Sequence, residues 1–310
     1  MANILVTGAS GFVGGQMASL LCGEHTVLGL GRRHAPLFPG PWRYETVEPG
    51  GPAFLELLER FRPDYLLHCA GTGAVGRTMQ FPAADYASGP ALTFALMDAL
   101  RQKAPGCVTI FTSSAAVHGN PTTQPIGLST PIAPISPYGF HKAMCESILQ
   151  EFRTVYGLDS IVLRIFSCYG PGLCKQIFWD ICRKAAQGRV DLFGTGEETR
   201  DFIHVSDLAR LTGLLVNQAR RSGVYPVGAG RSVSIARLSA LLVAALGVPE
   251  VPVVFRGDEH SGYPKHWLCD LAACAGLGFT PEIPLEDGAA EYAEWFLASG
   301  AAQAATGGAL

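Results

Sequence analysis

Close to its N-terminus the chain has a short apolar run, residues 4 to 6, followed at once by glycines spaced G-x-x-G-x-x-G over residues 8 to 14. Glycine allows a tight turn and a close approach of the backbone to a ligand. Between a first strand and a first helix, such a turn places dinucleotide phosphates at the helix N-terminus. An ordinary strand-to-helix loop is the alternative. Because the strand, the helix and the glycine positions agree, we predict a cofactor-binding turn made of Gly8, Gly11, Phe12, Val13 and Gly14.

Apolar runs bounded by Gly, Ser or Pro alternate with helix-like segments along the first half of the chain. The runs cover residues 4–6, 26–30, 65–69, 108–112 and 160–165, and helix-like segments include 16–21 and 92–102. This alternation predicts a parallel sheet with right-handed crossovers, which is a doubly wound α/β Rossmann domain. We also expect Cys69 and Ala70, at the end of the third run, to contact the cofactor.

The pattern changes after Gly170, where a Gly-rich turn at residues 194–196 precedes helices expected around 206–220, 234–246 and 285–298. We interpret this half as a smaller C-terminal α/β substrate domain. The predicted Rossmann domain covers residues 1–170 and about 201–228. The predicted substrate domain covers 171–200 and 229–300, and residues 301–310 are expected to be a flexible tail.

The composition favours small-molecule partners. The chain has 310 residues, 48% of them apolar, and a formal net charge of −3, which provides no field to attract nucleic acid or an anionic membrane. Its nine cysteines form no C-x-x-C pair and are expected to be reduced thiols. The N-terminal run has no signal-peptide pattern, and the longest uncharged apolar stretch, Leu238 to Pro249, is too short to span a bilayer. We therefore expect a cytoplasmic protein.

The end of the second strand bears on the choice of cofactor. An acidic residue there would bind the ribose 2′-hydroxyl of NAD, whereas an arginine accommodates the 2′-phosphate of NADP. The run ends in Gly31, Arg32 and Arg33, with no carboxylate. A solvated loop end with incidental charge is the alternative. We predict that Arg32 and Arg33 bind the cofactor, that NADP(H) is favoured and that NAD(H) is possible.

A second candidate site begins with a helix start at Ser136 and Pro137, a pairing typical of an N-cap followed by the first helical residue. Tyr138 and Lys142 then lie one turn apart on one helix face. An ammonium near a tyrosine favours its phenolate and suits the tyrosine to proton transfer. By itself Y-x-x-x-K is a common coincidence.

An apolar strand that ends in hydroxyls, residues 111 to 114, strengthens this prediction because ligands bind at the carboxyl edge of a doubly wound sheet. We expect Ser114 to hydrogen-bond the reacting oxygen. Ser113 is the runner-up and is otherwise a turn-capping hydroxyl. The Pro- and Thr-rich stretch from Asn120 to Pro134 is expected to form an active-site flap.

Together these motifs resemble the extended short-chain dehydrogenase/reductase family, particularly its nucleotide-sugar epimerases, dehydratases and reductases. The resemblance also rests on Leu163 to Phe166, Tyr169 to Gly172 and Gly194 to Asp207, and it covers nearly the whole chain. It implies that Ser114, Tyr138 and Lys142 are catalytic and that Lys142 also contacts the nicotinamide ribose. It further implies that Arg200 contacts the diphosphate of a nucleotide sugar, while an ion pair with Asp201 or Asp207 is the alternative.

Several positions depart from the family pattern. Dehydratases that resemble this chain carry Asp-Glu after the catalytic hydroxyl, where this sequence has Ala115 and Ala116. Ser167 and Gly89 replace asparagines, and His260 stands where a phosphate-binding arginine is common. The histidines show no metal-ligand spacing, so no metal is expected. The expected substrate-binding residues are Ser113, Ser114, Tyr138, Ser167, Arg200 and His260.

Three functions remain open. The leading hypothesis is an NADPH-dependent reductase of a nucleotide-linked 4-keto(-6-deoxy) sugar, and the second is an NAD-dependent nucleotide-sugar 4-epimerase. The third, a catalytically silent NAD(P)-binding regulator, is disfavoured because Tyr138 and Lys142 are both present. A homodimer is also expected, because residues 92, 94, 96, 97 and 100 form a broad apolar helix face and the helix from Tyr138 to Phe152 offers another.

Overall fold

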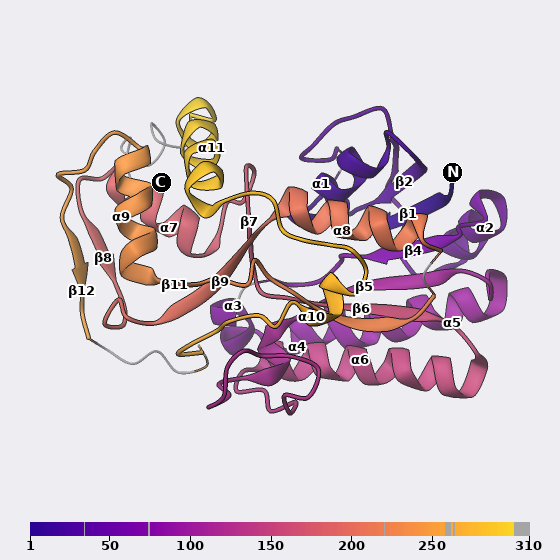
Figure 1. Ribbon diagram of the computed structural model, residues 1–310. Coiled ribbons are helices and arrows are strands. Elements are labelled where there is room, and N and C mark those ends of the chain that lie inside the picture. The colour runs from indigo at the N-terminus through magenta and orange to yellow at the C-terminus, as the bar shows by residue number, and fades with distance from the viewer. Residues whose placement is uncertain (34, 74, 220, 258–261, 263, 301–310) are drawn as a thin grey trace.

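A seven-stranded parallel sheet forms the larger part of the computed structural model, which describes residues 1–300 except 34, 74, 220, 258–261 and 263 (Figure 1). Its strand order is β10-β6-β5-β4-β1-β2-β3, with the neighbouring strands all parallel. The strands are β1 (Asn3–Thr7), β2 (Thr26–Leu30), β3 (Arg43–Glu45), β4 (Tyr65–His68), β5 (Val108–Ser114), β6 (Ser160–Ile165) and β10 (Gly223–Val227). The predicted Rossmann fold is confirmed. The tail predicted at 301–310 lies outside the described residues.

Helices cover both faces of this sheet. On one face lie α1 (Phe12–Leu21) and α8 (Val205–Asn217), and on the other α2 (Pro52–Phe61), α5 (Leu92–Lys103) and α6 (Pro137–Tyr156) (Figure 1). Alternate residues of each strand face opposite layers, so Ile4 and Val6 pack in the first core and Leu5 in the second. Burial on both faces explains why these strands form continuous apolar runs in the sequence.

Shorter elements connect these layers. They are α3 (Val75–Gln80), α4 (Pro82–Tyr86), the π-helical turn Ala87–Ala91 and the 3₁₀ turn Ala115–His118. Among the described residues, no helix combines the length and the apolar character needed to cross a membrane.

A second part is built around α7 (Gln176–Ala185), α9 (Ile235–Ala245) and α11 (Leu285–Ala298), which enclose a third core (Figure 1). The buried Tyr169 ring stacks on Phe178 in this core, with 4.4 Å between the ring centroids. Two small sheets complete this part. The first contains β7 (Ser167–Tyr169), β9 (Thr199–His204) and β11 (Ser232–Ser234), and the second contains β8 (Val190–Leu192) and β12 (Val253–Phe255). The short helix α10 (Ala272–Ala275) lies against β10.

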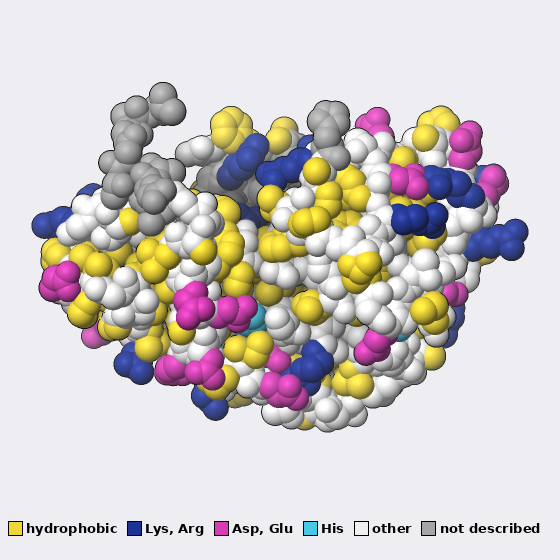
Figure 2. Space-filling model, turned by 90° about the horizontal axis from the view of Figure 1, so that it is seen from above, with side chains coloured by type: hydrophobic (Ala, Val, Ile, Leu, Met, Phe, Trp, Pro, Cys, Tyr) yellow, Lys and Arg dark blue, Asp and Glu magenta, His cyan; other side chains and the backbone are white. Residues whose placement is uncertain are grey.

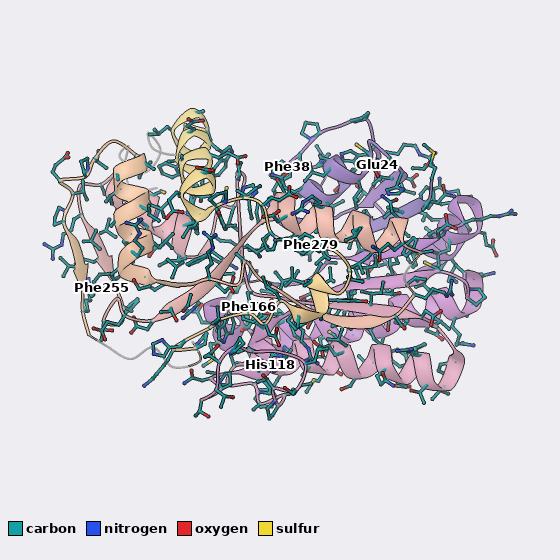
Figure 3. All side chains as sticks on the ribbon, viewed as in Figure 1. Glu24, Phe38, His118, Phe166, Phe255 and Phe279 are labelled. Carbon is teal, nitrogen blue, oxygen red and sulfur yellow. The ribbon has the colours of Figure 1, made fainter. Side chains whose placement is uncertain are left out.

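Aromatic side chains fill the junction between the two parts. Phe38 lies on the side of the first part that faces the second, and Phe166 lies where the two meet (Figure 3). The Phe38 ring occupies the space that β-carbons at Gly15 and Gly172 would need, which explains glycine at both positions. Phe166 packs edge-on against Trp267, with the ring centroids 5.6 Å apart.

The stretch predicted as a flap, residues 120–134, is fastened to the segment 264–270. The Ile126 N–H donates to the Leu268 carbonyl at 2.7 Å, and the Asp270 N–H donates to the Ile126 carbonyl at 2.9 Å. The Trp267 indole N–H donates to the Gly119 carbonyl at 3.1 Å. These bonds, with the fully buried Ile126 side chain, hold the stretch in place beside the junction.

Candidate active site

A cavity of about 1450 Å³ lies between the two parts, at the carboxyl ends of the parallel strands. Its walls include the turn after β1, the ends of β4, β5 and β6, and residues of β7, α7 and β9. Figure 2 shows Lys and Arg side chains gathered beside a hollow between the two parts. This is the edge at which doubly wound folds bind their ligands.

The glycine turn is closely packed where it borders the cavity. Gly8 has φ +74°, and a β-carbon there would fall 2.7 Å from the backbone nitrogen of Ala70. A β-carbon at Gly14 would fall 2.5 Å from the Gly8 carbonyl oxygen. The N-terminus of α1 lies at the cavity beside Gly8 and Gly11, where the backbone carries no side chain, and this arrangement fits the diphosphate of a dinucleotide. Gly8, Gly11, Phe12, Val13, Gly14 and Cys69 all line the cavity.

The end of β2 lies at the margin of this site. The side chains of Arg32 and Arg33 are exposed, and neither they nor Ala70 line the cavity itself. The Tyr44 hydroxyl donates to the Arg33 carbonyl at 2.8 Å and holds this turn against β3. Glu45, the one carboxylate of β3, forms an ion pair with Arg60. No carboxylate on the described β2 and β3 strands is therefore left unpaired for a ribose hydroxyl.

Helix α6 begins as predicted. The Ser136 hydroxyl accepts the Gly139 N–H at 3.2 Å, and Pro137 is the first helical residue. Tyr138 and Lys142 follow on the face toward the cavity, and both line it. The Lys142 ammonium donates to the Thr112 carbonyl of β5 at 2.7 Å and lies 5.9 Å from the centroid of the Tyr138 ring. The structure therefore places the tyrosine and the lysine beside each other.

The two serines at the end of β5 have different partners from those expected. The Ser114 hydroxyl oxygen accepts the Ala116 N–H at 3.1 Å, so Ser114 and not Ser113 caps the following turn. Its hydroxyl proton is left to donate into the cavity. The Ser113 hydroxyl donates to Glu146 Oε1 at 2.5 Å. Both serines line the cavity, but the Ser113 hydroxyl hydrogen is engaged in the hydrogen bond to Glu146 and is not available to a substrate.

Glu146 belongs to a buried ion pair behind the serines. Its Oε2 lies 2.7 Å from Arg164 Nη2, and the two side chains are only 10% and 9% exposed. His118 lies on the other side of Arg164, with its Nε2 3.4 Å from Nη1. Burial lowers the pKa of His118, so the ring is neutral and accepts from the guanidinium. The sequence analysis did not single out this pair.

Arg200 projects from β9 and lines the cavity, as does Ser167 of β7. The Arg200 guanidinium donates to the Thr199 carbonyl at 2.8 Å, and its central carbon lies 5.8 Å from the centroid of the Trp267 ring. Asp201 instead accepts backbone N–H bonds from Ala229, Gly230 and Cys269, and Asp207 pairs with Arg210. Both carboxylates are therefore engaged by partners other than Arg200. His260 lies outside the described residues.

Basic side chains dominate the cavity wall. Of the described residues, the basic ones that line it are Arg77, Lys142, Lys175, Arg183, Arg200 and Lys265, and the acidic ones are Asp180, Glu197 and Glu198. Arg183 pairs with Asp180, and Glu198 accepts N–H bonds from the 194–196 turn, so part of the negative charge is engaged locally. The remaining positive charge suits ligands that carry phosphates.

Four of these basic residues were missed by sequence reasoning, namely Arg77, Lys175, Arg183 and Lys265. They come from separate segments, and no spacing pattern marks them. Only Lys175 follows a motif that had been singled out, the turn at residues 169–172.

The arrangement places a hydroxyl, a phenol and an ammonium beside a phosphate-binding turn. This set of groups can bind a dinucleotide and move a proton at an alcohol or carbonyl oxygen held against Ser114 and Tyr138. Of the described residues, no group of three or more His, Cys, Asp or Glu is arranged to hold a metal ion.

The chain is similar to known proteins both in sequence and in fold. The family model described as the NAD dependent epimerase/dehydratase family matches residues 4–228. Among curated relatives, a UDP-glucose 4-epimerase of Azospirillum brasilense is 31% identical, over 92% of this chain and 89% of the relative. A dTDP-glucose 4,6-dehydratase of Actinoplanes sp. is 29% identical, over 96% of this chain and 98% of the relative.

A solved structure of MoeE5 in complex with UDP-glucuronic acid and NAD has a similar fold throughout. It superposes with a TM-score of 0.88 at 26% sequence identity, and the match covers 96% of this chain and 99% of that one. The predicted resemblance to extended short-chain dehydrogenases/reductases is therefore confirmed.

The buried pair behind the serines gives a testable prediction. Glu146→Gln leaves the Arg164 guanidinium buried without its counter-charge, and breaking such a pair costs about 3 to 5 kcal/mol. We expect a loss of this size in the free energy of unfolding measured by urea denaturation. Asp98→Asn removes an exposed ion pair with Arg101 on α5 and should cost less than about 1 kcal/mol. Similar losses in the two variants would contradict this account of Glu146.

Proposed function

The chain belongs to the NAD dependent epimerase/dehydratase family, and within this family we propose that it is a 4-epimerase of a nucleotide-linked sugar. It is an enzyme of the extended short-chain dehydrogenase/reductase type, and its relatives are named as nucleotide-sugar epimerases and dehydratases. The proposal concerns the reaction and the position on the sugar.

The observation behind this proposal is one that excludes the dehydratase reaction. Ser114, Tyr138 and Lys142 line one cavity, and the two positions that follow Ser114 are buried alanines. A dehydratase of this family needs an acid at that point to eliminate water, and Ala115 and Ala116 cannot supply one. Oxidation and reduction of a sugar carbon need only the hydroxyl, the phenol and the ammonium. This leaves epimerisation and simple reduction as the reactions that the residues support.

In the proposed reaction, each of the three residues has a different role at the C4 oxygen of the sugar. Tyr138 takes the proton from the C4 hydroxyl and returns it, and Ser114, whose oxygen accepts the Ala116 N–H, donates its hydroxyl hydrogen to the same sugar oxygen. Lys142, held by the Thr112 carbonyl, keeps a positive charge beside Tyr138. When bound at the glycine turn, a nicotinamide dinucleotide supplies the hydride acceptor and donor.

An NADPH-dependent reductase of a nucleotide-linked 4-keto(-6-deoxy) sugar is the second candidate. The exposed Arg32 and Arg33 at the end of β2 favour it, because two guanidiniums suit the 2′-phosphate of NADP. The sequence alone placed this reaction first. The relatives named as 4-epimerases and the solved structures that hold NAD favour the epimerase over the reductase.

The two reactions differ in stoichiometry, which gives the test of the proposal. Purified protein is incubated with UDP- and dTDP-hexoses without added cofactor, and products are followed by NMR. We expect interconversion of 4-epimers at constant nicotinamide absorbance. Consumption of one NADPH per product, together with no conversion in its absence, would establish the reductase instead.

Tyr138→Phe should lower kcat by roughly 10²-fold or more, because the variant loses the group that moves the proton. Binding of the cofactor, measured by calorimetry, should change little. Tyr156→Phe removes the same hydroxyl from an exposed position at the far end of α6 and should leave kcat unchanged. A Tyr138→Phe enzyme with near-normal kcat would rule out this role for the phenol.

For the reductase candidate, the arginine pair leads to a proposal about the cofactor, namely that NADP(H) binds more tightly than NAD(H). Arg32→Ala and Arg33→Ala should each weaken NADPH binding by about tenfold or more and NADH binding little, since a charge-assisted contact contributes about 1.5 to 3 kcal/mol. Arg237→Ala, at an exposed ion pair with Glu286, is the control. Unchanged NADPH affinity in both variants would refute this proposal.

We also propose a homodimer, with an interface that differs from the one expected from the sequence. Leu96, Met97 and Leu100, which the sequence offered as interface residues, are buried in the core of the single chain. Helices α5 and α6 lie side by side (Figure 1). The exposed apolar side chains on these two helices are Phe94, Phe140, Met144, Val155 and Tyr156. An apolar surface of this kind is typical of a protein interface.

Light scattering at micromolar concentration should give twice the chain mass of 32.8 kDa. Phe94→Glu should shift the protein toward the single chain because it places a charge in the interface. Leu20→Glu, at an exposed leucine of α1, should not. A mass near that of one chain for the unmodified protein would exclude the dimer.

A further inference from the structure

Lys175 reaches toward the loop that follows β4 from the beginning of α7. Its Nζ lies only 2.9 Å from the point where a β-carbon of Gly73 would be. Both residues line the cavity, one from the second part of the molecule and one from the first. The ammonium therefore occupies space that is open only because position 73 is glycine.

The neighbouring residue fixes this arrangement. Gln176 is a non-glycine residue with φ +63°, a left-handed conformation that is costly for a side chain with a β-carbon. Its side-chain amide donates to the Gly73 carbonyl at 2.7 Å. This bond joins the start of α7 to the loop after β4 and offsets part of the cost of the backbone conformation. Lys175 is thereby held at the cavity and is not left to a freely moving loop.

The charge of Lys175 has no counterpart in the described part of the chain. Its ammonium makes no hydrogen bond or ion pair with any described residue, in contrast to Lys184 on the same helix, which pairs with Asp180. The surrounding protein lowers the pKa of Lys175 by desolvation, and the charge of Lys142 lowers it further. An anion bound beside Lys175 would offset both effects by direct charge attraction.

We propose that Lys175 binds a phosphate oxygen of a diphosphate held in the cavity, and that glycine at position 73 makes room for its ammonium. The proposal rests on the proposed function only in that the cavity holds a dinucleotide and a nucleotide sugar, each of which contains a diphosphate. A lysine ammonium is a point charge that suits phosphate oxygens. The glycine turn after β1 lines the same cavity, and Arg200 lines it from β9.

Binding is measured by titration calorimetry, with NAD, NADP, UDP-glucose and dTDP-glucose as probes. Lys175→Met should weaken at least one probe that the unmodified protein binds by about tenfold or more, the effect of losing a charge-assisted contact. Weaker binding of the dinucleotides alone would assign Lys175 to the cofactor diphosphate. Weaker binding of the nucleotide sugars alone would assign it to the substrate diphosphate. Affinities within about twofold for every bound probe would overturn the proposal.

Lys103→Met is the matched control, because Lys103 pairs with Glu59 on the surface and does not line the cavity. It should leave every affinity unchanged. Because no turnover is measured, an enzyme that proves to be a reductase leaves this test intact.

Gly73→Ala gives a second variant that keeps the lysine. Its β-carbon would displace only the end of a flexible side chain, so the fold should be preserved while the ammonium moves. We expect Gly73→Ala to weaken the same probe as Lys175→Met, and to have no added effect in the double variant. If Gly73→Ala weakens binding of the probe in the Lys175→Met background as much as it does in the unmodified protein, Gly73 acts independently of Lys175. That result would refute the second half of the proposal.

Discussion

Helix α6 is held against the end of strand β5 by polar contacts that repeat along one helix face. The Lys142 ammonium bonds to the Thr112 carbonyl, and Glu146, one turn further, accepts from the Ser113 hydroxyl. Tyr138 lies one turn before Lys142 on the same face. With these two anchors, the phenol is fixed at the end of β5, where Ser114 projects into the cavity.

The attachment of α6 to β5 places the carboxylate of Glu146 in the interior, where it needs a counter-charge. Glu146 brings a negative charge into a buried place, and Arg164 from the adjacent strand β6 neutralises it. A buried pair of this kind contributes little net stability, but loss of one partner is costly. The pair therefore fixes the position of α6 relative to β5 and β6. The second part of the molecule contributes basic residues to the same cavity wall that contains Ser114, Tyr138 and Lys142.

The sequence predicted the elements that depend on local signals. Strands β1, β2 and β6 form continuous apolar runs because both their faces are buried, and α6 begins where Ser136 and Pro137 indicate. Three-residue strands such as β8 and β12 carry too few residues for a pattern to be visible. Helix α7 was missed as well, although its apolar residues pack into the third core.

Within the site, the sequence marked the three residues that we propose to be catalytic, and all three line the cavity, whereas the partners of these residues were not predicted. Either serine could cap the turn after β5, and the choice is made by Glu146, which lies 33 residues away from Ser113. Lys175 meets Gly73 over a still longer separation. Such contacts exist only after the chain has folded, so no local pattern marks them.

In the proposed epimerisation, a hydrogen leaves C4 of the sugar and returns to C4 within one cavity built around Ser114, Tyr138 and Lys142. The most direct measurement uses a nucleotide hexose with deuterium at C4, incubated in ordinary water without added cofactor and analysed by NMR and mass spectrometry. This mechanism predicts deuterium at C4 in both epimers, because hydrogen that is transferred as hydride is never released as a proton that could exchange with water. Loss of the label to solvent, or product formed only when NADPH is supplied, would contradict it.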